Sequence, residues 1–200
     1  MIARELQLFG IEAAALQETS CEAQSHLQEE DYTFFWVGKT VGPKEAGVAF
    51  AVHNTIAKRL ISLPTAVSPR LTSMRVPIEK GRYLTLVNVY APTMTYSVEG
   101  KETFYQELTH IVLMVPREDK LQILGDFNAR VGTDWETYKC IIHKFGKKKK
   151  ISNGELLLNF CAQLELSITN TFFYQPDTPG SIHAQVTTTC STMPSRESQT

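Results

Sequence analysis

The sequence predicts an α/β fold of two mixed β-sheets with helices on the outside. A run of strand-like segments is followed by a helix, a strand, a second helix and a last strand, so antiparallel hairpins and helical crossovers are both expected. This order argues against a doubly wound parallel sheet, and neither a GxGxxG nor a P-loop sequence is present. The 200 residues, 42% of them hydrophobic, suffice for one ordinary core.

The first half of the chain is expected to be mostly β-structure. A short helix opens it, because Ile2, Leu6 and Phe9 share one helix face and Gly10 is a good helix stop. The next segments are rich in β-branched and aromatic residues and predict strands over 11–19, 32–37, 47–53, 71–78 and 83–90. Pro77 suits a strand near a sheet edge, because proline donates no ladder hydrogen bond.

The second half is expected to alternate helices with strands. Phe104, Leu108 and Ile111 form one apolar stripe, which predicts a helix over 98–116. A short buried strand over 121–124, a helix over 153–164 and a strand over 167–171 follow. Half of residues 185–200 are Ser or Thr, so this end cannot bury enough apolar surface to offset its ordering entropy. We therefore expect a domain over 1–173 and a disordered tail over 174–200.

Composition excludes several classes of protein. No apolar run approaches the roughly 20 residues of a membrane-spanning helix, and the N-terminus has no signal peptide. The four cysteines are widely spaced without a CxxC pair, which argues against a zinc site or a disulfide framework. We expect an intracellular protein, nuclear or cytoplasmic, with no membrane contact. The formal net charge of −1 argues against histone-like binding of nucleic acid but leaves room for a local basic patch.

The segment LGDFNARVG, residues 124–132, is the sharpest local feature. It places Asp126 and Asn128 two residues apart at the end of a buried strand, where α/β sheets commonly have their sites. A carboxylate can accept a proton from water or hold a cation, and an amide can donate to a phosphate oxygen. The alternative interpretation is a turn, because Asp, Asn and Gly are common turn residues.

Two further strand ends carry polar groups. Glu18 ends the first predicted strand and Tyr90 ends the strand over 83–90. Alone, Glu18 is interpreted as a solvated strand end and Tyr90 as a half-buried ring with its hydroxyl in water. Together with Asp126 and Asn128 they indicate more, because the strand ends of an open sheet converge on one cleft.

The motifs LQET, NVYAP and LGDFNARVG, in this order and spacing, resemble the endonuclease/exonuclease/phosphatase superfamily. Within it, the sequence is similar to RTE-type non-LTR retrotransposon endonuclease domains and to craniofacial development protein 2-like proteins. The segments YTFFWVG, AGVAFAVHN, SPRLTSMRVPI and NGELLLNFCAQLELSITNTFF fit the same group. The resemblance spans roughly residues 1–173.

The resemblance implies a two-sheet sandwich with outer helices and a Mg²⁺-dependent site for phosphodiester hydrolysis. Carried over by motif, Glu18 would ligand Mg²⁺, Asp126 would orient and deprotonate the attacking water, Asn128 would hold the scissile phosphate, and Tyr90 would stabilise charge on it. Asn170 or Thr171 would reach the nucleic-acid backbone. The expected partner is nucleic acid, DNA rather than RNA, and no oligomeric state is predicted.

The sequence also departs from the family pattern. The family normally begins with a strand that carries an Asn and ends with a Trp-containing strand, an Asp-containing strand and an Asp-His pair. Here Met1 falls after the position of that first strand, and Asp177 and His183 are not adjacent. We therefore expect a partial domain without its first and last strands, derived from a retrotransposon endonuclease and inactive or impaired. The alternatives are a non-catalytic module that binds nucleic acid or protein, and an incomplete gene model.

A lysine run follows the LGDFNARVG segment and comprises Lys147, Lys148, Lys149 and Lys150. Such a run is typical of a solvated loop. The alternative is a patch that binds the phosphates of nucleic acid, in which case affinity would fall steeply with salt.

Overall fold

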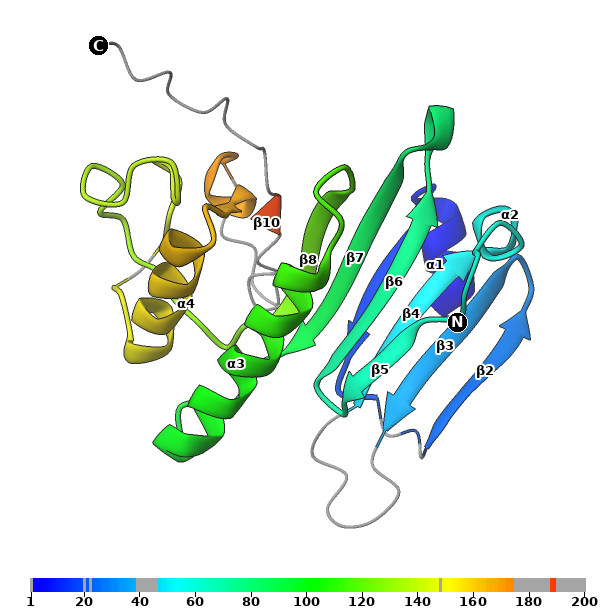
Figure 1. Ribbon diagram of the computed structural model, residues 1–200, viewed down its shortest axis with the longest axis horizontal. Coiled ribbons are helices and arrows are strands. Elements are labelled where there is room, and N and C mark those ends of the chain that lie inside the picture. Colours follow the sequence, from blue (N-terminus) through cyan, green and yellow to red (C-terminus); the bar gives the residue numbers. More distant parts are fainter. Residues whose placement is uncertain are drawn as a thin grey trace.

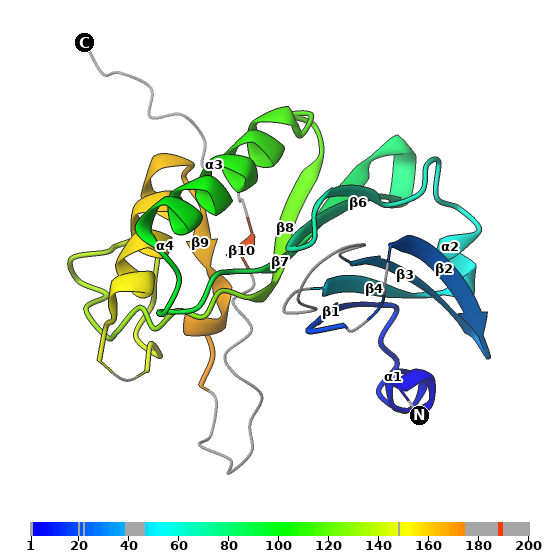
Figure 2. The same cartoon turned by 90° about the horizontal axis from the view of Figure 1, so that it is seen from below.

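The computed structural model describes residues 2–19, 21, 23–38, 47–147, 149–174 and 188–189. They form two β-sheets that face each other, and helices cover the outer side of the larger sheet (Figures 1 and 2). This is the α/β arrangement that the sequence predicts. No helix among these residues is long and apolar enough to cross a membrane.

The smaller sheet is fully antiparallel and has the order β1-β4-β3-β2. Its strands are β1 (Ala13–Gln17), β2 (Gln24–Glu29), β3 (Tyr32–Gly38) and β4 (Gly47–His53). The helices α1 (Ile2–Leu8) and α2 (Asn54–Ala57) precede β1 and follow β4. All of β4 except its last residue is buried, which explains why GVAFAVH reads as a continuous apolar strand.

The larger sheet has the order β5-β6-β7-β8-β10-β9. Its strands are β5 (Thr65–Ser68), β6 (Leu71–Pro77), β7 (Tyr83–Tyr90), β8 (Lys120–Asp126), β9 (Ser167–Ile168) and β10 (Thr188–Thr189). β7 and β8 are parallel, and α3 (Val98–Met114) is their crossover. Pro77 is the last residue of β6, one strand in from β5. The mixed sheet thus combines hairpins with a helical crossover.

Two apolar clusters hold the layers together. One lies on the outer side of the larger sheet, where Phe104, Leu108 and Ile111 of α3 pack with Leu157 and Leu158 of α4 (Ser152–Gln163) and with β7 and β8. The other lies between the sheets and combines Phe35, Phe50 and Val52 of the smaller sheet with Met74, Val76 and Leu86 of the larger one. The apolar stripe predicted from 98–116 is therefore the buried face of α3.

Several predicted boundaries need correction. The helix over 98–116 ends at Met114, because Val115 precedes a proline and takes extended backbone angles. The strand over 167–171 ends at Ile168, and Thr169–Thr171 form the 3₁₀ turn η2. The strands β2, β5 and β10 were not predicted. β2 has the polar sequence QSHLQE and is exposed along its whole length, so it lacks the apolar alternation of a half-buried strand.

Thr188 and Thr189 lie within the expected tail yet form β10 between β8 and β9. The other residues of 175–200, among them Asp177, His183 and Cys190, lie outside the described part of the chain. The division into a domain over 1–173 and a tail stays a prediction.

Candidate active site at the strand ends

Glu18 and Tyr90 meet where the two sheets come together. Glu18 directly follows β1 of the smaller sheet, and Tyr90 is the last residue of β7 in the larger sheet. The Tyr90 hydroxyl donates a hydrogen bond of 2.9 Å to Glu18 Oε1. Tyr90 is 7% exposed, and its ring packs with Val37 and Val48 of the smaller sheet. The convergence of strand ends predicted from the sequence is therefore present for this pair.

A buried asparagine fixes the two strands at this point. Asn88 lies on β7, two residues before Tyr90, and is fully buried. Its amide nitrogen donates to the carbonyl oxygens of Leu16 at 3.1 Å and Ala49 at 2.7 Å, and its amide oxygen accepts from Gln17 Nε2 at 2.8 Å. These bonds join β7 to β1 and β4, so they position Glu18 beside Tyr90.

Asp126 and Asn128 reach the same place from β8. In the parallel pairing Asp126 lies opposite Tyr90, and its carbonyl oxygen accepts from the Ala91 N–H at 2.8 Å. Asp126 Oδ1 accepts from the Asn128 N–H at 2.7 Å, and Asn128 Nδ2 donates to the Ala91 carbonyl at 2.8 Å. The segment therefore forms the turn of the alternative interpretation, which places both side chains at the strand end, and their part in chemistry stays a prediction.

Positive φ values mark the backbone of this site. Glu18 has φ of 57° and Asn128 has φ of 47°. Asparagine tolerates this conformation, whereas glutamate does so rarely, so the backbone at Glu18 is held there by its surroundings. Gly125 has φ of 138°, and a Cβ at this position would collide with the carbonyl oxygen of Val89. Glycine thus permits the close approach of β7 and β8 that brings Asp126 level with Tyr90.

Asn153 and Gly154 support the loop that carries Asn128. Asn153, at the start of α4, is 3% exposed and donates through Nδ2 to the carbonyls of Pro92 at 3.0 Å and Asn128 at 3.1 Å. Gly154 lies so close to the carbonyl of Arg130 that a Cβ would collide with it. The sequence analysis did not select either residue. The available signal was the Asn-Gly pair at the start of a predicted helix, which costs helix propensity and therefore indicates a packing need.

Arg70 supplies positive charge beside Tyr90 and was also missed. Its guanidinium lies over the rings of Tyr90 and Tyr96, at 5.0 and 4.8 Å from their centroids. It donates to the Tyr90 carbonyl at 3.1 Å and to the Tyr96 hydroxyl at 2.7 Å. Two rings and two acceptors fix a rigid planar cation here. No sequence signal in the Ser-Pro-Arg turn indicated this.

Burial raises the pKa of Tyr90 to about 12, and the hydrogen bond and charge of Glu18 act in the same direction. The Asp126 carboxylate also raises this pKa, whereas the Arg70 guanidinium lowers it. The Tyr90 phenol is therefore a neutral hydrogen-bond donor at physiological pH. Its single O–H is donated to Glu18 Oε1, so in this structure the phenol holds the Glu18 carboxylate in place.

This pKa leads to an expected pH dependence of stability. In the unfolded chain Tyr90 loses its proton near pH 10, while in the folded chain it does so near pH 12. The stability contributed by this difference is fully present below about pH 10 and is lost as pH rises through about 12. Urea unfolding between about pH 9 and 11.5 should show a steeper loss for the wild type than for Tyr90→Phe. Tyr174→Phe, which alters an exposed ring, should parallel the wild type, and equal slopes for wild type and Tyr90→Phe would contradict the assignment.

The remaining predicted residues lie around α4 and β9. Thr171 is buried, donates through its hydroxyl to the Ile168 carbonyl at 2.7 Å and accepts from the His143 N–H at 2.8 Å, so its side chain fixes the loop. Asn170 keeps a buried amide oxygen without a partner among the described residues. Lys150 Nζ donates to the Tyr138 hydroxyl at 3.1 Å, Lys149 is exposed, Lys147 is half-buried, and Lys148 lies outside the described residues. That these residues contact nucleic acid stays a prediction.

Glu18 and Asp126 are the residues at the strand ends that could hold a metal ion. Glu18 and Asp126 supply two carboxylates, and the described residues contain no group of three or more His, Cys, Asp or Glu that could hold a metal ion. Mg²⁺ prefers oxygen ligands and is commonly bound by one or two carboxylates together with waters and substrate phosphates. A zinc site needs three or four protein ligands, usually with nitrogen or sulfur.

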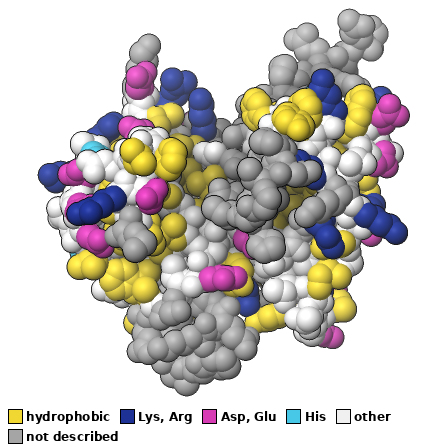
Figure 3. Space-filling view, turned by 180° about the vertical axis from the view of Figure 1, so that it is seen from behind, with side chains coloured by type: hydrophobic (Ala, Val, Ile, Leu, Met, Phe, Trp, Pro, Cys, Tyr) yellow, Lys and Arg dark blue, Asp and Glu magenta, His cyan; other side chains and the backbone are white. Residues whose placement is uncertain are grey.

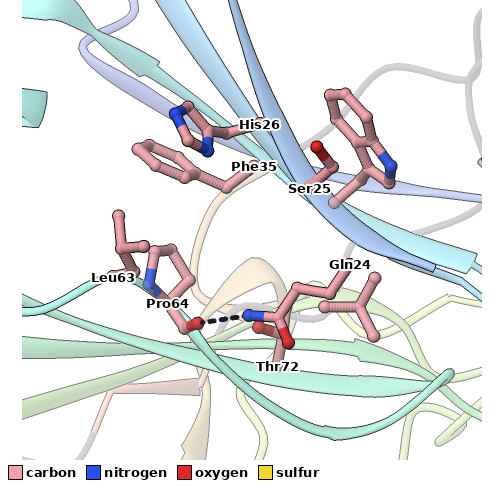
Figure 4. A pocket seen from close by; sticks show the side chains of 9 residues that line it. Gln24, Ser25, His26, Phe35, Leu63, Pro64 and Thr72 are labelled. Carbon is pink, nitrogen blue, oxygen red and sulfur yellow. Dashed lines mark hydrogen bonds between the residues drawn. The ribbon is translucent and has the colours of Figure 1, made fainter.

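A pocket of about 260 Å³ lies next to this site (Figure 4). It opens between β2 and β3 on one side and the segment before β5 on the other, where Gln24 Nε2 donates to the Pro64 carbonyl at 3.3 Å. Val37 lines the pocket and also packs against Tyr90. The lining contains no carboxylate, and His26 is the side chain in it that could bind a metal or accept a proton.

The fold is similar to that of two solved structures. The chain is similar to the endonuclease domain of TRAS1, a telomere-specific non-LTR retrotransposon, with a TM-score of 0.59 and 19% identity over 94% of this chain and 76% of that one. It is also similar to an endonuclease/exonuclease/phosphatase family protein from Leptotrichia buccalis C-1013-b, with a TM-score of 0.55 and 13% identity over 94% and 79% of the two chains. The protein therefore has the endonuclease/exonuclease/phosphatase-type fold.

Two curated proteins are similar to the chain in sequence. Craniofacial development protein 2 of Bos taurus is 30% identical over 177 residues, and that of Tragulus javanicus is 29% identical over 177 residues. These alignments cover 88% of this chain but only 29% and 30% of the two relatives, so the chain spans less than a third of their length. No family model matches the sequence.

Proposed function

We propose that the strand-end site hydrolyses phosphodiester bonds of nucleic acid, foremost DNA, with the help of Mg²⁺. The observation that carries the proposal is the Tyr90–Glu18 hydrogen bond, which joins the two sheets where Asp126 lies opposite Tyr90. Glu18, Tyr90, Asp126 and Asn128 are the residues that the motif resemblance selects, and they come together from three strand ends. Kinship with a retrotransposon endonuclease is part of the proposal, supported by the fold shared with the TRAS1 domain.

Each side chain has a defined role in this proposal. Glu18 holds the metal ion, which when bound neutralises phosphate charge and makes water a better nucleophile. Asp126 uses one carboxylate oxygen to accept the Asn128 N–H, and its other oxygen accepts the proton of the attacking water. Asn128 has a second amide N–H besides the one bonded to Ala91, and donates it to a phosphate oxygen. Tyr90 keeps Glu18 in place through its one O–H, and stabilises charge on the phosphate when that O–H turns from Glu18 Oε1 to a phosphate oxygen.

We expect impaired turnover, because the sequence departs from the family pattern. These four residues include no histidine, and lacking one charge-stabilising donor typically lowers a rate by about 10²–10³-fold. The alternative of a non-catalytic module would show binding of nucleic acid without cleavage, so the two are separated by one assay.

Nicking of supercoiled plasmid tests the proposal. Purified protein with Mg²⁺ should convert the plasmid to its nicked form, and EDTA should stop the conversion because the metal is removed. Glu18→Gln should require a higher Mg²⁺ concentration, since an amide is a weaker cation ligand than a carboxylate.

Glu30→Gln is the matched control. Glu30 also follows a strand and also has a positive φ, of 53°, but its exposed carboxylate contacts Arg4 at 3.4 Å instead of the site. It should nick as the wild type does. Nicking that continues in EDTA, or a folded wild type that leaves the plasmid intact, would contradict the proposal.

A further inference from the structure

Six of the 20 Lys and Arg residues of this chain lie in one loop. Residues 137–150, between β8 and α4, contain six lysines and neither Asp nor Glu, the exposed Asp134 and Glu136 flank Trp135 just before them, and the whole chain has a net charge of −1. Figure 3 shows Lys and Arg side chains on both halves of the molecule, together with Asp and Glu side chains. A local basic patch on a chain that is otherwise acidic indicates a polyanionic partner.

Aromatic rings are interleaved with these lysines. The Trp135 ring is stacked on His143, at 6.3 Å and 28°, and His143 contacts Phe172 at 5.3 Å. Beside them Phe145 and Tyr174 meet edge to face at 6.1 Å. Trp135 is 40% exposed. Tyr174 is 72% exposed, although a ring of this size usually buries most of its surface. The loop and the segment after η2 therefore present rings to solvent.

Two of the lysines contact aromatic rings of this loop. Lys144 Nζ lies 5.1 Å from the centre of the Phe145 ring, and Lys150 Nζ lies 5.2 Å from that of Tyr138 while donating to its hydroxyl. Lysine stems can lie along apolar rings while their ammonium groups remain in water. Positive charge and aromatic faces thus share one surface, made of Trp135, Tyr138, His143, Lys144, Phe145, Lys149, Lys150, Phe172 and Tyr174, which we name the stacking surface.

We propose that the stacking surface binds single-stranded nucleic acid, with unpaired bases stacked on Trp135 and Tyr174 and the backbone held by the lysines. Base stacking on exposed rings within a basic groove is how proteins bind single strands without reading sequence. A duplex offers no free base face, because its bases are stacked on each other. A protein partner is disfavoured, since lysine is depleted in protein–protein interfaces. This function goes beyond the proposed hydrolysis and does not require Asp126.

Fluorescence anisotropy in EDTA measures the binding without cleavage. The probes are labelled oligothymidylate and oligouridylate of about 20 nucleotides, longer than a typical single-strand site, and a DNA duplex of the same length. Both single strands should bind more tightly than the duplex. Trp135→Ala and Tyr174→Ala should each weaken single-strand binding by about 5- to 100-fold, the effect of losing one stacked base. Lys149→Ala should lower the slope of log affinity against log salt by about 0.7.

Phe9→Ala is the matched control, because Phe9 is an exposed aromatic residue, 71% exposed, next to α1. It should bind as the wild type does. A second readout uses Trp36→Phe, in which Trp135 is the remaining tryptophan, and its emission should be quenched by the oligonucleotide even if Trp135→Ala fails to fold. Tighter binding to duplex, unchanged affinity in a folded Trp135→Ala, or no quenching would overturn the inference.

The outcome is distinct from that of the nicking assay. Glu30→Gln should bind the single strands as the wild type does, since Glu30 belongs neither to the strand-end site nor to the stacking surface. Single-strand binding without any nicking would remove the proposed hydrolysis and leave the stacking surface in place. Nicking without single-strand binding would do the reverse.

Discussion

Asp126→Asn is expected to lower the rate of Mg²⁺-dependent plasmid nicking by about 10²–10⁴-fold, the usual contribution of a general base. The amide keeps the size of the side chain, and its oxygen can still accept the Asn128 N–H that Asp126 Oδ1 accepts at 2.7 Å. The turn is therefore expected to persist. What is lost is a carboxylate oxygen that can take a proton from water.

Asp134→Asn is the matched control for this experiment. Asp134 lies in the loop after β8, is exposed and accepts the Thr137 N–H at 3.2 Å, so it also serves a turn through its carboxylate. Its replacement should leave the nicking rate within about twofold, as expected for a surface position. Equal rates for Asp126→Asn and the wild type would remove Asp126 from the chemistry.

Asn88→Leu is expected to lower the free energy of unfolding by about 4 kcal/mol, a large part of the 5–15 kcal/mol typical of a domain. Leucine is similar in size but makes none of the three hydrogen bonds of Asn88. The carbonyls of Leu16 and Ala49 and the Gln17 amide would then lose a partner inside the protein, at about 1–3 kcal/mol for each such group. Urea unfolding followed by circular dichroism measures the change.

A comparison at an exposed site isolates the effect of burial. Gln7 Nε2 donates to Asp31 Oδ2 at 2.9 Å and also joins distant parts of the chain, but the pair is exposed. Gln7→Ala should cost less than about 0.5 kcal/mol, because water replaces the lost bond. Should Asn88→Leu be as mild as this, the bonds of Asn88 would not be what joins β7 to β1.

The fold could be predicted where burial leaves a pattern in the sequence. YTFFWV, GVAFAVH and YLTLVNVY are buried on one or both faces, and their apolar residues indicated β3, β4 and β7. β2 could not be predicted, because its six residues are exposed and it is held only by pairing with β3. Thr188 and Thr189 join the sheet through backbone hydrogen bonds to β8 and β9, and such bonds leave no mark in a Ser- and Thr-rich sequence.

The polar side chains at the strand ends could be predicted from the sequence. The residues that hold them in place could not. Glu18, Tyr90 and Asp126 were selected because polar side chains at strand ends differ from the apolar strands before them. Asn88 was not selected, since its partners Leu16 and Ala49 are distant in sequence. Arg70 was missed for the same reason, because its role depends on two rings that only the folded chain brings together.

Nicking rates of four proteins, the wild type, Glu18→Gln, Asp126→Asn and the double variant, test most directly whether the strand ends form one hydrolytic site. Residues that act together in one step are strongly non-additive, so the double variant should be no slower than the slower single variant. Rate losses that multiply would contradict a shared step. Nicking at the wild-type rate in the double variant, or a folded wild type without Mg²⁺-dependent nicking, would contradict the site itself.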